Sequence, residues 1–462
     1  MDILSQDDLA PGVRRMRPDD HFMVLSETDA SPMHVGALLV LAVPETEKAG
    51  FHGAVRRQLA ERLPLTPLLA RLRQSPEGHD SDVWVDDAAV DLDALIQSGQ
   101  SGGTWDDPAL RADIARRNMQ RLDLGGPPFA AVVYDRLEGD RCAIYVKMHH
   151  AVADGIGFQS ILRLLSDATP AAPPRQKGGE LPSDVIWRAV AEARFEREAP
   201  LREAHAARRK EATEALRADP SLRRSPTPVL KLSGPTAPVR AYATLSLPLA
   251  RLKAIGAALD GTVNDIFLSL AGTALRRYLQ EIGDLPDDPI VVNSARSYRR
   301  PEHGPFGNRI VAQNPHLATH IADPFERLRA IQAAMALEKR RTGYDEVMLD
   351  SPEKPFGARD RRAAFAQRAE GGKAIIPGNI TLSNVPGPAE RFRFAGYAQV
   401  ANFPVPIIGS SRFLNITSRR NGESLDMGVI VDPTKITDVD KVARFFVEAA
   451  GAFERAIAEG YR

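Results

Sequence analysis

Cysteine is almost absent from this sequence, since Cys142 is the only one in 462 residues. A single thiol excludes an internal disulfide framework and a cysteine-rich zinc site, and it is typical of a reducing compartment. Net charge is absent as well, because 60 basic residues balance 60 acidic residues. This balance gives no basis for nucleic-acid binding.

Long apolar runs are also lacking. The longest candidates, such as residues 37–43, have the length of a strand and fall short of the roughly 18 residues that a membrane-spanning helix needs. Residues 1–8 lack the basic and apolar regions of a signal peptide. We therefore expect a cytoplasmic protein, with peripheral contact at a membrane or lipid-droplet surface if it works on lipid.

The composition that is present, 43% hydrophobic and 26% charged, is typical of a globular protein long enough for two domains. Prolines flank a glycine-free stretch over residues 183–216 that is rich in Ala, Arg and Glu, which predicts helix. We expect an N-terminal domain over residues 1–169, a proline-bounded helical crossover over 170–239 and a C-terminal domain over 240–462.

Helix and strand patterns alternate in both halves, which predicts a mixed α/β fold. Asn421-Gly422 lies between two strand patterns, at 413–416 and 425–431, and predicts a hairpin. Within the crossover, the basic run at 208–210 is interleaved with glutamates and indicates a solvated helix face. Docking of this basic helix on anionic lipid is the alternative.

Residues 149–155 (HHAVADG) place two adjacent histidines at the end of a predicted strand. Successive strand residues point to opposite faces, so His149 and His150 cannot enter the same cavity. One is expected to face reactants and the other to be buried. A purely structural histidine pair is one alternative. A metal site is another, although no third ligand lies at a recognised spacing.

This segment matches the HHxxxDG motif of the chloramphenicol acetyltransferase-like superfamily, and the chain resembles its bacterial wax ester synthase/diacylglycerol acyltransferase branch. The resemblance covers residues 17–458. It rests on further segments in the expected order: PMHVG at 32–36, WVDD at 84–87, DLD at 91–93, ND at 264–265, GN at 307–308, DPFERL at 323–328 and SNVPGP at 383–388.

The resemblance implies two domains of mixed sheets flanked by helices, with an active-site tunnel between them. It implies that His150 is the general base, while His149 packs behind the site. Asp154 is then expected to pair with an arginine, for which Arg296 is one candidate, and Gly155 to meet a backbone requirement. No metal and no cofactor are expected, because acyl-CoA is itself the activated substrate.

Other segments have two interpretations each. Thr381, Ser383 and Asn384 either donate to the oxyanion or only shape a turn. Asn264 and Asp265 are expected to cap or brace the helix that they open and to support the motif from behind. The chain has Pro127, Pro128 and Phe129 where the family often has Pro-Leu-Trp, a region linked with substrate handling. This departure leaves the acceptor open.

We therefore expect an acyltransferase that makes wax esters or triacylglycerol from a fatty acyl-CoA and a long-chain alcohol or diacylglycerol. A specialised small alcohol or amine as acceptor, or a carrier-protein-bound donor, is the alternative within the same chemistry. A non-catalytic acyl-binding protein and a metal-dependent hydrolase are the alternatives outside it. The sequence does not indicate an oligomeric state.

Overall fold

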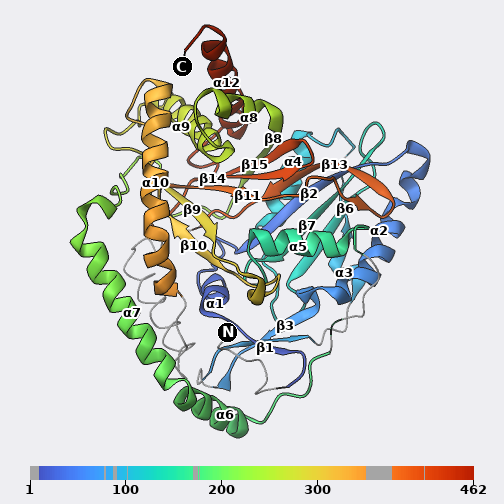
Figure 1. The fold of residues 1–462 in the computed structure, drawn as a ribbon. Coiled ribbons are helices and arrows are strands. Elements are labelled where there is room, and N and C mark those ends of the chain that lie inside the picture. Colours follow the sequence, from blue (N-terminus) through green and yellow to red (C-terminus); the bar gives the residue numbers. More distant parts are fainter. Residues whose placement is uncertain are drawn as a thin grey trace.

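The structure is a computed structural model that describes residues 10–76, 80–86, 91–100, 102–169, 175, 177–349, 377–409 and 411–461. Two six-stranded sheets and one three-stranded sheet form its framework, with helices packed around them (Figure 1). The predicted mixed α/β class is confirmed. Parts of three predicted segments lie outside the described residues. They are Asp87 of the WVDD segment, residues 170–174 of the crossover, and Arg462 of the C-terminal domain.

The first large sheet has the strand order β12-β13-β2-β7-β6-β5. Only β5 and β6 pair in parallel; the other neighbours are antiparallel. In register, His34 lies opposite His149. The strands are β2 (His34–Ala42), β5 (Ile96–Ser98), β6 (Phe129–Tyr134), β7 (Arg141–His149), β12 (Arg393–Phe394) and β13 (Tyr397–Val405).

Both faces of this sheet are covered, which explains why β2 is apolar from Val35 to Ala42. Leu39 and Leu41 pack with α2 (Lys48–Arg62) and α5 (Gly155–Leu165), while Leu38 packs on the opposite face with α4 (Pro108–Asn118). The alternation of strand side chains thus divides one hydrophobic run between two cores.

The second large sheet has the order β10-β9-β11-β14-β15-β8. The predicted hairpin is confirmed, because Asn421 pairs with Ser424 across the turn and Gly422 has a φ of 63°. The strands are β8 (Ala241–Pro248), β9 (Val292–Ser297), β10 (Ile310–Gln313), β11 (Ile380–Val385), β14 (Leu414–Asn421) and β15 (Ser424–Val431). Its helices are α8 (Leu249–Ala258), α9 (Val263–Glu281), α10 (Pro324–Leu349) and α12 (Val439–Ala458).

A small sheet, β1-β4-β3, lies at the opposite end of the molecule from α12 (Figure 1). It comprises β1 (Val13–Arg15), β3 (Ala70–Arg73) and β4 (Val83–Asp86), and the short helices α1 (Pro18–Leu25) and α3 (Leu92–Leu95) belong to the same half. Single-turn 3-10 helices are found at Glu45–Glu47, Leu63–Leu65, Pro67–Leu69, Pro220–Leu222 and Pro301–His303.

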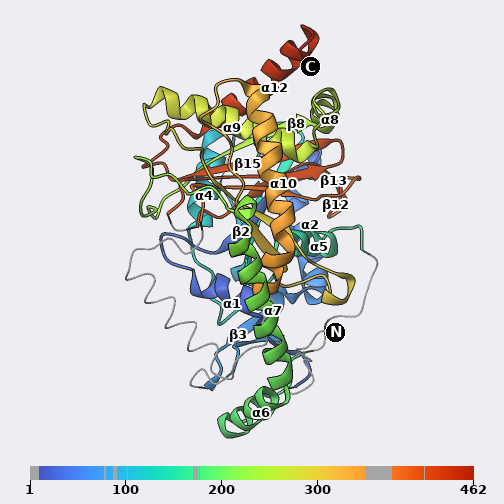
Figure 2. The ribbon, with the colours of Figure 1, turned by 60° about the vertical axis from the view of Figure 1, so that its left-hand side comes forward.

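The predicted helical crossover contains two helices, α6 (Asp184–Arg197) and α7 (Ala199–Ala218), with Pro200 in the first turn of α7. Buried Asp80 holds α6, since it accepts hydrogen bonds from Trp187 Nε1 at 2.9 Å and from Arg194. Further along, α7 runs beside α10 in both views (Figures 1 and 2), and His205 Nε2 lies 2.8 Å from the carbonyl oxygen of Val347.

The second half contributes strands to the first sheet. Residues 393–405 form β12 and β13, and β13 pairs with β2 of the first sheet, although the predicted boundary at 240 would assign these residues to the second domain. Asn402 N of β13 also donates to Asp426 Oδ2 of the second sheet at 2.8 Å. The predicted boundaries do not describe this pairing of β13 with β2, which joins the two sheets.

Among the described residues, no single helix is long and apolar enough to cross a bilayer. Only α8 and α9 taken together reach that length and composition, and they are bent by 93° relative to each other.

Candidate active site

The two histidines of the motif diverge at the end of β7. His149 is the last residue of the strand and is fully buried, whereas His150 keeps part of its surface exposed. This division follows from the alternation of side chains along a strand. The backbone continues the sheet for one more contact, because His150 N donates to Met33 O at 2.7 Å.

His149 lies in a pocket of buried polar groups. Its Nδ1 accepts a hydrogen bond from Ala151 N at 3.1 Å, and its Nε2 lies 3.5 Å from Glu27 Oε1. Glu27 also accepts from Met33 N at 3.0 Å and from the guanidinium of Arg121 at 2.8 Å. Burial opposes ionisation of Glu27, but these hydrogen bonds and the nearby His149 lower its pKa to about 2.

His34 stands behind His149 in the same pocket, with the ring centroids 5.9 Å apart. Its Nε2 accepts from Leu122 N at 3.1 Å, so the proton is on Nδ1, which faces Asn118 O at 3.3 Å. Burial and the charge of Lys147 lower the pKa of His34 to about 3. The histidine of the PMHVG segment is therefore a neutral, hydrogen-bonded support.

His150 points to the other side, toward the second half of the chain. Its Nδ1 lies 2.9 Å from Asn308 Oδ1, and Asn308 Nδ2 donates to the carbonyl oxygen of His150 at 2.8 Å. Burial lowers the pKa of His150, while the charge of Asp154 and hydrogen bonds with its own carbonyl and with Asn308 oppose that shift. The imidazole is thus neutral near neutral pH.

Asp154 holds the loop after His150 in place. Its Oδ1 caps α5 by accepting from Gly157 N at 2.9 Å, and its Oδ2 accepts from Arg299 at 2.9 Å and from Arg309 N at 2.9 Å. The arginine partner is therefore Arg299, and the candidate Arg296 was wrong. Arg296 belongs to β9 and is exposed, three residues before Arg299.

Residues 304–309, which we call the clasp, connect the second half of the chain to the motif. Gly307 N donates to Val152 O at 2.8 Å, and Ala153 forms a parallel bridge with Gly307. Arg299 secures the clasp by donating to the carbonyl oxygens of Gly304 at 2.7 Å and Phe306 at 2.8 Å. The clasp brings Asn308 to His150.

Gly155 packs closely against the second sheet. A Cβ at this position would lie 3.0 and 3.1 Å from the two methyl carbons of Val385, at the end of β11, so Val385 would have to move by a few tenths of an ångström. Close approach of the second sheet, and not a left-handed φ, therefore favours glycine here.

The predicted oxyanion and bracing residues meet each other. Asn384 Nδ2 lies 3.4 Å from Asn264 Oδ1, and Asn384 Oδ1 accepts from Ser418 Oγ at 3.0 Å. Thr262 is the N-cap of α9, and Asp265 forms a reciprocal capping box with it. Among the described residues, no hydrogen bond joins His150 to Thr381, Ser383 or Asn384, and an oxyanion role for these three stays a prediction.

The segment that departs from the family pattern lies beside His149. Pro128 O accepts from His149 N at 3.0 Å, and Pro127 and Phe129 line a cavity of about 300 Å³. Lys147 also lines it, and burial lowers the pKa of this lysine to about 8. Pro127 and Phe129 thus border this cavity, on the face of the sheet opposite to His150.

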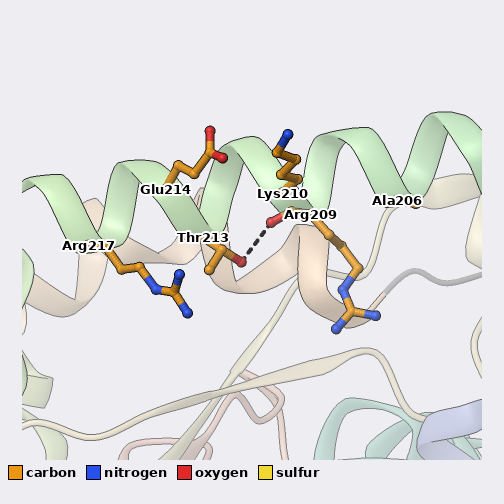
Figure 3. A pocket seen from close by; sticks show the side chains of 6 residues that line it. All are labelled: Ala206, Arg209, Lys210, Thr213, Glu214 and Arg217. Atoms are coloured by element: carbon orange, nitrogen blue, oxygen red, sulfur yellow. Dashed lines mark hydrogen bonds between the residues drawn. The ribbon is translucent and has the colours of Figure 1, made fainter.

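A second hollow lies on α7 and is lined by Ala206, Arg209, Lys210, Thr213, Glu214 and Arg217 (Figure 3). One helix supplies all of these residues, and its charged side chains point to both sides of the helix in the figure. Arg209, Lys210 and Glu214 are exposed, as predicted for a solvated helix face. Among the described residues, no group of three or more His, Cys, Asp or Glu side chains is arranged to hold a metal ion.

Sequence reasoning missed three groups that the structure brings to the motif: Asp20, Glu27 and Arg299. Each is distant in sequence from residues 149–155, so local spacing carries no signal for them. Asn308 and His34 both belong to segments of the family resemblance. The resemblance pointed to these segments but did not predict a role for either residue.

Residues 16–267 match the wax ester synthase/diacylglycerol acyltransferase catalytic domain, and residues 306–453 match the C-terminal domain of the same family. A Mycobacterium tuberculosis protein named as a candidate diacylglycerol O-acyltransferase is 31% identical over 94% of this chain and 96% of its own length. A second one from that organism is 28% identical over 96% of this chain and all of its own length.

Solved structures show the same fold. The wax ester synthase/diacylglycerol acyltransferase from Marinobacter aquaeolei matches 95% of this chain and 98% of its own, with a TM-score of 0.67 and 22% identity. The first condensation domain of the CDA synthetase matches with a TM-score of 0.57 and 17% identity, over 95% of this chain and 96% of its own. The predicted fold is thereby confirmed.

Proposed function

The chain belongs to the wax ester synthase/diacylglycerol acyltransferase family, and from this premise we propose that His150 is the general base of acyl transfer from acyl-CoA to a hydroxyl group. The observation that carries the proposal is the contrast between the two motif histidines. His150 is a partly exposed, neutral imidazole where the two halves meet, whereas His149 is fully buried.

A neutral imidazole suits the chemistry of ester formation. An alcohol is a weak nucleophile, and it becomes an effective one as its proton leaves during attack. A lowered pKa keeps His150 in the base form at neutral pH. A positioned base of this kind contributes about 10²- to 10⁴-fold in rate, which is about 3–5 kcal/mol of barrier.

The reaction then balances without another reactant. The acceptor oxygen forms a bond to the thioester carbonyl carbon while His150 Nε2 takes the hydroxyl proton. When the tetrahedral intermediate collapses, the carbon–sulfur bond breaks and the imidazolium returns the proton to the departing thiolate. The products are the ester and free coenzyme A, and no separate cofactor is needed because the thioester is already activated.

We propose a long-chain alcohol or diacylglycerol as the acceptor and a fatty acyl-CoA as the donor. The names of the similar proteins support these classes. The replacement of the family's usual Pro-Leu-Trp by Pro127-Pro128-Phe129, beside a cavity that holds a buried lysine, favours testing small alcohols and amines as well.

The test measures release of free coenzyme A from palmitoyl-CoA by purified protein, first with hexadecanol and then with a diacylglycerol. We expect thiol release that depends on the acceptor and that falls at least about 10²-fold in His150→Ala. His320→Ala, which removes an exposed histidine from the second half, is the matched control and should keep full activity.

Equal release by the wild type and His150→Ala would refute the base assignment. Ligand binding with no release for any acceptor or carrier-bound donor would support a non-catalytic acyl-binding protein instead. Loss of release on chelation, restored by a metal ion, would point to metal-dependent hydrolysis.

We also propose that the protein works in the cytoplasm and touches lipid surfaces peripherally. Val185 and Ile186 on α6 are 79% and 56% exposed, and the exposed basic run at 208–210 follows on α7. Exposed apolar side chains together with nearby basic side chains are the combination that binds anionic lipid surfaces. Co-sedimentation with anionic vesicles should weaken in Val185→Asp, and unchanged binding would contradict the proposal.

A further inference from the structure

Asn308 is the centre of a short chain of hydrogen bonds that ends on His150. Its backbone N and its Nδ2 both donate to Asp20 Oδ1, at 2.7 and 2.8 Å. Nδ2 also donates to the carbonyl oxygen of His150 at 2.8 Å, and Oδ1 lies 2.9 Å from His150 Nδ1. Asp20 and Asn308 are both buried, so water does not replace these contacts.

Only one orientation of the Asn308 amide satisfies this arrangement. The side-chain nitrogen faces two accepting oxygens. One is Asp20 Oδ1, which also accepts from the backbone N of Asn308, and the other is a backbone carbonyl oxygen. Rotating the amide by half a turn would point its oxygen at both acceptors and leave all three without a proton between them. Burial makes such unsatisfied groups costly. Asp20 therefore prevents the amide from flipping.

The orientation of the amide then determines the tautomer of His150. Asn308 Oδ1 can only accept, so the hydrogen bond at 2.9 Å requires a proton on His150 Nδ1. A neutral imidazole carries one proton, which leaves Nε2 with a free lone pair. Nε2 is the atom that must receive the proton of the acceptor hydroxyl. The opposite tautomer would have no lone pair at that position.

We propose that Asp20 and Asn308 are positioning residues that hold His150 in the tautomer able to act as base, Asp20 by fixing the Asn308 amide and Asn308 by accepting from Nδ1. This inference rests on the proposed function of His150. The two residues come from α1 and from the clasp, so docking of the two halves favours the reactive tautomer.

Three variants separate this role from simple support of the fold. Asp20→Ala leaves the Asn308 amide free to flip. Asn308→Ala removes the side-chain acceptor and leaves His150 only the hydrogen bond with its own carbonyl oxygen. Asp20→Asn removes the charge but keeps an oxygen that can accept both bonds from Asn308. Asp19→Asn and Asp19→Ala are the matched controls, because neighbouring Asp19 instead accepts from Tyr298 at 2.7 Å.

For Asp20→Ala and Asn308→Ala we expect kcat with palmitoyl-CoA and hexadecanol to fall about 10²-fold, with KM for palmitoyl-CoA unchanged. Asp20→Asn should recover most of that loss. In ¹⁵N-histidine-labelled protein, the His150 signal, assigned by its absence in His150→Gln, should show an unprotonated Nε2 in the wild type and in Asp20→Asn. In Asp20→Ala it should move toward a mixture of tautomers.

Wild-type kcat in Asp20→Ala would overturn the proposal. So would an equal loss in Asp20→Ala and Asp20→Asn with an unprotonated Nε2 in both, since the effect would then be structural. If His150→Ala itself keeps activity, the proposed base is wrong and the inference falls with it. If His150→Ala is inactive while both positioning variants turn over normally, only this inference fails.

Discussion

The two sides of the end of β7 are built from different parts of the chain. On the His149 side, the contacts come from His34, Glu27 and neighbouring residues of the first half. On the His150 side, the imidazole contacts Asn308, which is 158 positions away in the sequence. Two adjacent, chemically identical residues therefore have different surroundings, one formed within the first half and one formed only when the halves dock.

One motif thus provides a structural histidine, His149, and the proposed reactive histidine, His150. The His149 side is buried, and there the pKa of Glu27 is lowered to about 2 and that of His34 to about 3. The His150 side keeps an exposed edge and a basic atom without a protein partner in the described contacts. Stability is expected to depend more on the first side and turnover more on the second.

Breaking the clasp should give the largest effect. Arg299→Met leaves the buried carboxylate of Asp154 without its cationic partner, and removing one member of a buried pair costs about 3–5 kcal/mol. Turnover should fall together with stability, because the clasp carries Asn308. Thermal melting and thiol release on the same preparation measure both losses.

The double variant Arg299→Met/Asp154→Asn is the control for this prediction. Asparagine removes the uncompensated charge and keeps an oxygen that can cap Gly157 N. It should recover part of the stability that Arg299→Met loses. A double variant that is less stable than the single one would contradict the assignment of Arg299 as the partner of Asp154.

Acid should weaken the His149 side through His34. The pKa of His34 is about 3 in the folded protein, against 6.5 for an unperturbed histidine, so between these values the unfolded chain binds one more proton than the folded chain. Stability from this site is complete above about pH 6.5 and is lost as the pH falls toward 3, at ~1.4 kcal/mol per unit. Between pH 6.5 and 5 the loss is about 2 kcal/mol.

His34→Gln removes this titration and serves as the reference. Urea unfolding followed by tryptophan fluorescence reports the relevant half, because the three tryptophans are Trp84, Trp105 and Trp187. Stability of the wild type should fall more steeply with acid than stability of the variant. Parallel pH dependences would show that His34 is not held neutral.

Gly307→Ala should give the smallest effect. Gly307 has a φ of 73°, and an added Cβ would meet only Asp20 Oδ2 at an ordinary 3.4 Å. The left-handed conformation therefore causes the cost, which is about 1–2 kcal/mol for a residue other than glycine. Gly304→Ala, in the same clasp at a φ of 67°, is the comparison. Unchanged melting in both variants would mean that the clasp tolerates rearrangement.

The sequence could predict the features that depend on neighbouring residues. Alternation along a strand separates His149 from His150, and the Asn421-Gly422 turn specifies the β14–β15 hairpin. It could not predict which arginine meets Asp154, because Arg296 and Arg299 differ by three positions and only the course of the loop after β9 decides between them. The pairing of β13 with the first sheet has no signal in the local sequence either. A strand that pairs with another domain has the same alternation of side chains as any other strand.

The role of Asp20 could not be predicted from the sequence either. A carboxylate in a short helix far from the motif has an ordinary sequence environment, and its role follows only from the hydrogen bonds of Asn308. The contact between Asn264 and Asn384 was not predicted either, although both belong to segments of the family resemblance.

The most direct test of the account compares His149→Gln and His150→Gln, with melting temperature and acceptor-dependent thiol release measured on the same preparations. We predict that His150→Gln melts like the wild type and loses turnover by at least about 10²-fold. His149→Gln should lower the melting temperature and retain a larger share of its turnover per folded molecule. A normally melting, inactive His149→Gln beside an active His150→Gln would contradict the central claim.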